Sequence, residues 1–169
     1  AIDPVLARYG GLAEHYFALE PRHAVVKLRQ MAEHMAQQVA ARAGLAVAAE
    51  DGFLDLLRRL ERQEVLPREA AALFHHLRVE GNKAVHDHGL AISHGTALHF
   101  LKGARALAVW FYRFARSDPG FNPGPFVPPA DPLAAEQSVR DELDRLRAEL
   151  AGHGEALADA RRLADERAA

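Results

Sequence analysis

Cysteine is absent from this sequence of 169 residues. Its absence excludes disulfide frameworks, thiolate metal sites and cysteine nucleophiles. Long apolar runs are absent too, so we expect neither a membrane span nor a membrane partner. No charged-then-apolar leader opens the chain, and we therefore predict a cytoplasmic protein. Because the first residue is Ala1 rather than Met, we expect a fragment or a processed chain.

Several enzyme motifs are also missing. Residues 1–116 contain a single serine, Ser93, and no serine-nucleophile elbow or glycine-rich phosphate loop can be found. Apart from a short extended loop expected at 45–49, no stretch alternates polar and apolar residues long enough to form a strand. These gaps disfavour nucleophilic catalysis and sheet-based folds.

Charge and proline content divide the chain into three parts. Residues 1–116 hold 15 basic and 12 acidic side chains, whereas residues 117–169 hold 6 basic and 11 acidic ones. Between them, residues 118–132 contain six prolines, a density that excludes a helix or a central strand. We therefore predict a bundle at 1–116, a Pro/Gly-rich linker at 117–132 and a charged helix at 133–169.

Apolar residues upstream of the linker recur at steps of three and four, which is the period of amphipathic helices. The pattern predicts helices over 5–19, 22–42, 53–60, 68–86 and 93–115. Pro21 lies where the first turn of a helix tolerates proline, and Gly44 lies where a helix tends to end. The predicted fold class is therefore all-α, a helical bundle.

The predicted helix at 133–169 has a heptad pattern. Its apolar residues fall on a and d positions, and the pattern is interrupted at His153: Val139, Leu143, Leu146, Leu150 and Leu157. Two interpretations stay open. The helix leans on a partner as a weak coiled coil, or it is a solvated connecting helix.

The most informative patch lies in the helix predicted over 68–86. Arg78, Asn82 and His86 are spaced four residues apart, so a continuous helix places them on one face as a ladder of donors that ends in a titratable imidazole. Gly81 costs such a helix about 1 kcal/mol relative to alanine, which points to a close packing contact. Either the three residues form a site, or Asn82 and His86 bond to a neighbouring segment and lock the bundle.

Two further polar patterns are candidates for parts of a site. Lys27, Arg29, Glu33 and Gln37 form a second polar row, which is either a surface pair or the opposite wall of the site. Six of the ten histidines lie between residues 75 and 99, but their spacings match no metal-binding motif. We therefore expect no metal.

Three segments together resemble a known family: residues 26–33, 73–86 and 108–113, followed by a Pro-rich tail that ends at 126–129. They resemble the N-terminal helical domain of type I restriction enzyme motor subunits (HsdR) and related DEAD/DEAH helicases, over residues 1 to about 130. The resemblance implies that the full-length protein is an ATP-dependent restriction endonuclease and helicase in antiviral defence. No Walker loop or Asp-Glu-Ala-His box is present here, so ATP and Mg are expected only in a following motor domain, and this chain itself needs no cofactor.

That domain is similar in turn to the HEPN bundles, many of which are metal-independent ribonucleases with an Arg and a His a few residues apart. Here Asn82 and His86 match the signature, but Gly81 stands in place of the arginine, and without that guanidinium the histidine lacks its electrostatic partner. The resemblance therefore favours a noncatalytic module for subunit docking or nucleic-acid positioning. Its binding residues would be drawn from Lys27, Arg29, Glu33, Arg78, Asn82, Lys83 and His86.

Two alternatives stay open. In the first, the domain is a HEPN-like ribonuclease that uses His86 as acid or base, Arg78 as phosphate clamp and Asn82 for orientation. Such bundles commonly form the site across a dimer, so this alternative also predicts a homodimer. In the second, it is a nucleic-acid reader in which Lys27, Arg29, Arg78 and Lys83 contact phosphates. The small positive charge of the bundle predicts only weak binding of DNA or RNA.

Overall fold

The computed structural model describes residues 3–48, 51–87, 89, 91–130 and 132–168. In these ranges the chain is all-helical and contains no strand, which confirms the predicted fold class. The helices are α1 (Pro4–Leu19), α2 (Pro21–Arg42), α3 (Phe53–Arg62), α4 (Arg68–His86), α5 (His94–Arg116) and α6 (Pro132–Ala168). Each of these helices is too short or too polar to cross a membrane.

Local sequence signals start and end the helices close to the predicted residues. Asp3 caps α1 by accepting a hydrogen bond from the Val5 N–H, and Ser93 caps α5 by accepting one from the Thr96 N–H. Pro21 opens α2, and Gly44 takes a φ of 71° just after its end. The extended loop expected at 45–49 has no helix or strand over 45–48, and residue 49 lies outside the described part of the chain.

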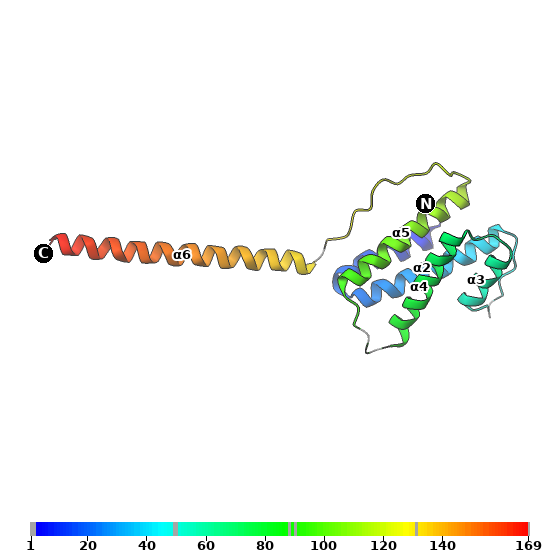
Figure 1. The fold of residues 1–169 in the computed structure, drawn as a ribbon, viewed down its shortest axis with the longest axis horizontal. Coiled ribbons are helices and arrows are strands. Elements are labelled where there is room, and N and C mark those ends of the chain that lie inside the picture. Colours follow the sequence, from blue (N-terminus) through cyan, green and yellow to red (C-terminus); the bar gives the residue numbers. More distant parts are fainter. Residues whose placement is uncertain (1–2, 49–50, 88, 90, 131, 169) are drawn as a thin grey trace. The chain divides into compact units, whose positions relative to one another are not determined.

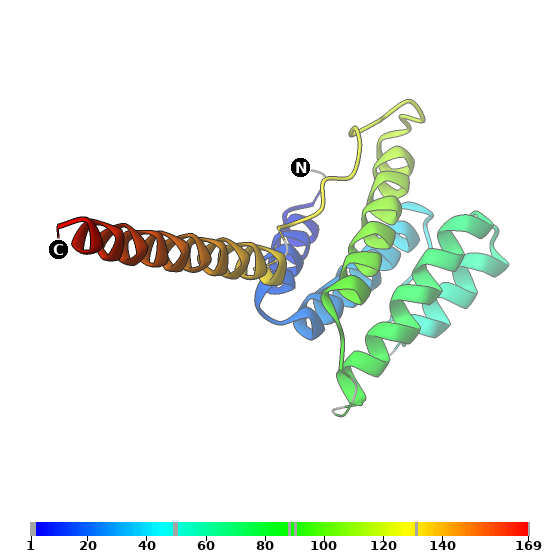
Figure 2. The ribbon, with the colours of Figure 1, turned by 60° about the vertical axis from the view of Figure 1, so that its left-hand side comes forward.

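The first five helices form a bundle around α2, which packs against α1, α3, α4 and α5 (Figure 1). Turned by 60°, the same bundle shows α3 and α4 side by side at one edge (Figure 2). Phe74 of α4 is fully buried, with Phe53 of α3 and Trp110 of α5 packed edge-on at 6.5 and 6.0 Å. The largest buried side chains come from all five helices, so one continuous core holds the bundle together.

The linker is helix-free over 118–130, but it is held along α5. Arg113 donates two hydrogen bonds to the Phe121 carbonyl at 2.9 and 2.8 Å, and Arg105 donates to the Gly124 carbonyl at 2.5 Å. The Phe121 ring stacks on Tyr112 with centroids 3.9 Å apart. By its contacts the chain divides into two compact units, Ala1–Pro129 and Ala130–Ala169, so the linker up to Pro129 belongs with the bundle.

The second unit consists of α6. Helix α6 begins at Pro132, one residue before the predicted start, because proline is tolerated in a first helical turn. Its apolar heptad residues are exposed within this unit.

Candidate functional site

The packing of α4 against α2 depends on Gly81 and Arg29. A Cβ atom on Gly81 would lie 2.5 Å from the Cβ of Arg29 and 2.9 Å from its Cγ and Cδ, which is far inside van der Waals contact. The glycine therefore lets the stem of Arg29 pass directly over the α4 backbone. This is the close contact that the glycine predicted, and its partner is a side chain of the second polar row.

Beyond Gly81, the Arg29 guanidinium connects the two helices. Its Nε donates to Oδ1 of Asn82 at 2.6 Å, and its Nη1 donates to Oε2 of Glu33 at 3.0 Å. The guanidinium also lies 5.9 Å from the centre of the Phe53 ring. All three polar side chains are partly buried, so this network satisfies polar groups in the seam between α2 and α4.

The three residues of the predicted ladder share a helix but not an environment. Asn82 bonds to Arg29. Arg78 is half-buried, and its Nε is buried without a hydrogen-bond partner. His86 is the last residue of α4 and is exposed. The helix thus aligns the three along its length, while only Asn82 takes part in the network at the seam.

The other predicted binding residues are scattered. Lys27 donates to Gln30 on its own helix at 3.1 Å and lines a cavity of about 290 Å³ against α1. Lys83 is exposed and pairs with Glu80 at 2.6 Å. Of the second polar row, the structure brings Arg29 to Asn82 and pairs it with Glu33, whereas Lys27 faces α1 and Gln37 is exposed.

The histidines of residues 75–99 occupy separate positions. His75 pairs with Glu61 of α3 at 2.8 Å. His76 stacks on Phe100 with centroids 5.0 Å apart and meets His99 edge-on at 5.4 Å, and its Nε2 is buried without a hydrogen-bond partner. Within the described residues, which leave out His88, no three or more His, Asp or Glu side chains gather as a metal site would require.

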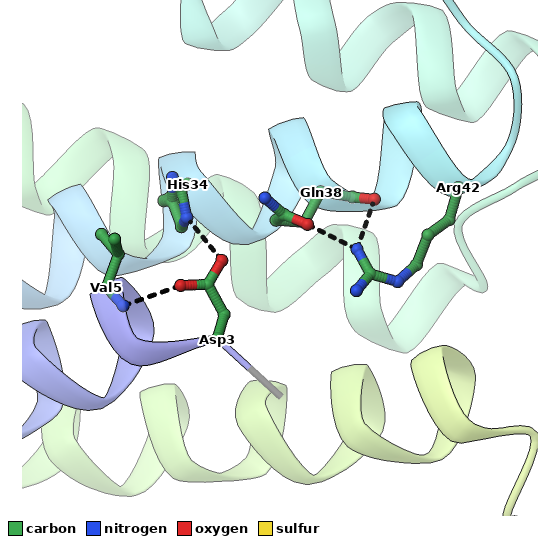
Figure 3. A network of polar contacts seen from close by, with 5 residues as sticks. All are labelled: Asp3, Val5, His34, Gln38 and Arg42. Atoms are coloured by element: carbon green, nitrogen blue, oxygen red, sulfur yellow. Dashed lines mark hydrogen bonds and ion pairs between the residues drawn. The ribbon is translucent and has the colours of Figure 1, made fainter. Parts of the chain in front are cut away.

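Arg22 and Asp3 each form long-range hydrogen bonds that the sequence did not predict. Arg22 of α2 donates to the carbonyls of Ala84 and Asp87 at 3.0 and 2.7 Å, at the carboxyl end of α4, where a cation complements the helix dipole. Figure 3 shows the other contact, in which Asp3 accepts from the Val5 N–H at 2.7 Å and bonds to Nε2 of His34 at 2.9 Å. The Asp3-Pro4 pair signals a helix start, but no sequence pattern names Arg22 or His34 as partners.

These contacts also set the protonation of Asp3. Burial raises the pKa of its carboxyl, but the hydrogen bonds from His34 and from the Val5 N–H outweigh burial, so this pKa lies below its usual range. The bond between Asp3 and His34 also connects the start of α1 to α2. The side chains shown beside them, Gln38 and Arg42, bond to each other within α2 at 2.5 Å (Figure 3).

An apolar groove runs between α1, α2 and α5. It has a volume of about 330 Å³ and is lined mainly by Leu6, Met31, Met35, Phe111 and Tyr112. Asp3, which bonds to His34, also lines the groove. The sequence places these residues on apolar helix faces and gives no sign that the packing leaves a groove between them.

Comparison with known families matches residues 12–116 to DUF4145, a domain of unknown function. The match covers more than half of the chain, and the chain belongs to this family. It spans the bundle from the middle of α1 to the end of α5 and includes the Arg29–Asn82 network. No curated protein and no solved structure matches the chain.

Proposed function

We propose that the bundle is a noncatalytic N-terminal module of an ATP-dependent type I restriction or defence helicase–nuclease subunit, and that it docks onto other subunits of the complex. The context comes from the resemblance of residues 1 to about 130 to the motor subunits of type I restriction enzymes. The noncatalytic role is supported by one observation above all. Asn82, the central residue of the ladder, is bonded to Arg29 in the seam between α2 and α4.

This network argues against a phosphate site along α4. A ladder that grips a phosphate needs its donors free and converging on one open surface. Instead, the bond from Arg29 to Oδ1 holds Asn82 in the seam, Arg78 is half-buried and His86 is exposed at the end of α4, so the three side chains do not share one open surface. The geometry thus favours the locking interpretation of Asn82, in which its role is to hold two helices at a short separation.

The pairing and position of the four basic side chains favour docking onto protein over nucleic-acid positioning. Two of the four basic residues considered for phosphate contact are paired with carboxylates, Arg29 with Glu33 and Lys83 with Glu80. Arg78 is half-buried, and Lys27 lies on the side of α2 that faces α1. They do not form one basic surface, so little counterion release would accompany binding to DNA or RNA.

The ribonuclease alternative has one observation in its favour. His86 is exposed, and Arg22 bonds to carbonyls on both sides of it, those of Ala84 and Asp87. Tertiary structure thus brings an arginine to the end of α4, where His86 lies, although the signature position itself, five residues earlier, is Gly81. The same hydrogen bonds hold the Arg22 guanidinium on backbone carbonyls, which makes it a helix cap first.

One set of assays separates the three functions. Labelled duplex DNA and single-stranded RNA are titrated with the chain at low and physiological salt, and both labels are then run on a gel. Docking predicts weak binding and no cleavage, together with co-purification of the tagged chain with co-expressed subunits of the complex. Metal-independent RNA cleavage that is lost in His86→Ala would establish the enzyme instead, and tight, salt-sensitive binding without cleavage would establish a positioning module.

A further inference from the structure

Helix α6 carries an apolar stripe with no partner in its own unit. The stripe residues are exposed by 46% to 74% of their surface: Val139, Leu143, Leu146, Leu150 and Leu157. Their steps of four, three, four and seven residues place Leu143, Leu150 and Leu157 at a positions, with Val139 and Leu146 at d. Such a seam buries its side chains only when a second helix lies along it.

The charged residues beside the stripe specify what that second helix is. In this register Glu142 and Glu149 occupy g positions on one flank, and Arg140 and Arg147 occupy e positions on the other flank. A parallel partner with the same sequence sets each g residue against the e residue five positions later in the opposite chain. Glu142 then faces Arg147 of the second copy, and Arg147 faces Glu142 of the second copy.

An antiparallel copy would meet the opposite situation. Antiparallel packing brings g against g and e against e, so glutamates would face glutamates and arginines would face arginines. Like charges at such positions repel. The flanks therefore fit a parallel copy and disfavour an antiparallel one.

From this pattern we infer that α6 joins two copies of the chain as a parallel, in-register two-stranded coiled coil. The inference is independent of the proposed function, since it uses α6 alone. It also selects between the two interpretations of residues 133–169, in favour of the helix that leans on a partner. Two bundles are then held in one particle, each through its own linker.

Ion pairs within α6 do not compete strongly with this assembly. Arg145 lies 3.1 Å from Glu142 and 3.7 Å from Glu149, and Arg147 lies 3.4 Å from Asp144. All of these side chains are more than half exposed, and such intrahelical pairs contribute only about 0.3–0.5 kcal/mol each. The glutamate and arginine at g and e therefore keep their capacity to pair across the seam.

His153 marks where the seam weakens. It lies at a d position, so a polar ring stands where the pattern otherwise has an apolar side chain. Gly152 and Gly154 on either side of it weaken the helix there, because glycine is a poor helix former. The firmest part of the seam is thus Val139–Leu150. Replacing His153 with leucine should tighten the dimer, because it restores an apolar d layer.

The mass of the full chain in solution is the first test, by sedimentation velocity up to about 100 μM, the range that a short coiled coil requires. We expect a dimer that Leu146→Lys dissociates and that the matched outward substitution Ala148→Lys leaves intact. A chain that is monomeric throughout this range overturns the proposal, and so does a dimer that survives Leu146→Lys.

A mixing experiment guards against a variant that merely unfolds. Glu142→Arg and Arg147→Glu should each raise the dimer dissociation constant by about tenfold, since each turns two attractive pairs into repulsive ones. Mixed in equal amounts, the two variants should form a heterodimer as tightly as the original chain, because residue 142 of each chain again faces an opposite charge at residue 147 of the other. Mixing that restores nothing contradicts the e–g pairing.

Orientation is read from a disulfide, which the absence of cysteine makes unambiguous. Val139→Cys places the two thiols in one d layer of a parallel dimer and at opposite ends of an antiparallel one. Mild oxidation should therefore cross-link Val139→Cys quickly, while Ser138→Cys, one residue away at an outward c position, should react slowly. Equal rates for the two variants, or no cross-link at position 139, would refute the parallel arrangement.

Discussion

Replacing Gly81 with alanine tests the seam between α2 and α4 most directly. The added Cβ would lie 2.5 Å from the Arg29 Cβ, where ordinary contact begins at 3.4 Å, so the helices must separate by about 1 Å. Overpacking of this kind costs about 1–3 kcal/mol. Loss of the Arg29–Asn82 hydrogen bond costs about 1 kcal/mol more, and the better helix propensity of alanine returns about 1 kcal/mol.

The net expectation for Gly81→Ala is a loss of about 1–3 kcal/mol in the free energy of unfolding. Urea unfolding followed by tryptophan fluorescence measures it, because the single tryptophan, Trp110, packs on Phe74 of α4 and reports the bundle alone. Gly11→Ala is the matched control, since its Cβ would meet nothing within 4 Å, and it should stabilise by about 0.5–1 kcal/mol. If Gly81→Ala stabilises as much as the control does, the close approach of Arg29 to α4 is refuted.

Three further predictions follow from single contacts. Asn82→Ala should lower the free energy of unfolding by about 1 kcal/mol in the same assay, because it leaves Arg29 Nε without its acceptor, whereas Lys83→Ala at an exposed position should change it little. Asp3→Asn should lower the stability of the bundle at neutral pH, because the lowered pKa of Asp3 adds stability only while its carboxyl is ionised. The difference in melting temperature between the variant and the original chain should therefore shrink as the pH falls below about 4. A series of thermal melts checks this, and a difference that stays constant with pH would contradict it. Arg105→Ala should speed chymotryptic cleavage after Phe121 and Phe126, because it removes the hydrogen bonds to the Gly124 and Pro125 carbonyls that hold the linker. Arg116→Ala is the control, and equal cleavage rates for the two variants would show that Arg105 does not hold the linker.

Helices and their ends were readable from the sequence because both depend on neighbours along the chain. Apolar residues at steps of three and four marked the buried faces, as in α4, where Phe74 and Leu77 are fully buried as predicted. The starts predicted at residues 22, 68 and 93 lie within one residue of the observed starts of α2, α4 and α5. Such signals act within one or two turns, so no knowledge of the bundle was needed to use them.

The site was only half readable. Gly81 signalled a close contact, and Asn82 was recognised as either a site residue or a lock. The partner of both is Arg29, which lies 53 residues from Asn82. The sequence placed Arg29 in a second polar row that was either a surface pair or the opposite wall of the site, and did not decide between the two. The hydrogen bond between Asp3 and His34 joins residues 31 positions apart, and the bond from Arg22 to the Ala84 carbonyl joins residues 62 positions apart. No local sequence pattern encodes either pairing.

By itself, then, the sequence determined an all-helical chain, the extents of its helices, a proline-rich break and a heptad seam on the last helix. Periodicity and capping are properties of a single helix, so they survive without tertiary context. Tertiary structure alone decided that Arg29 crosses Gly81, that Asn82 belongs to a seam, and that the linker lies along α5. Those pairings depend on which helix faces cross and how closely the backbones approach, which is settled only when the core packs.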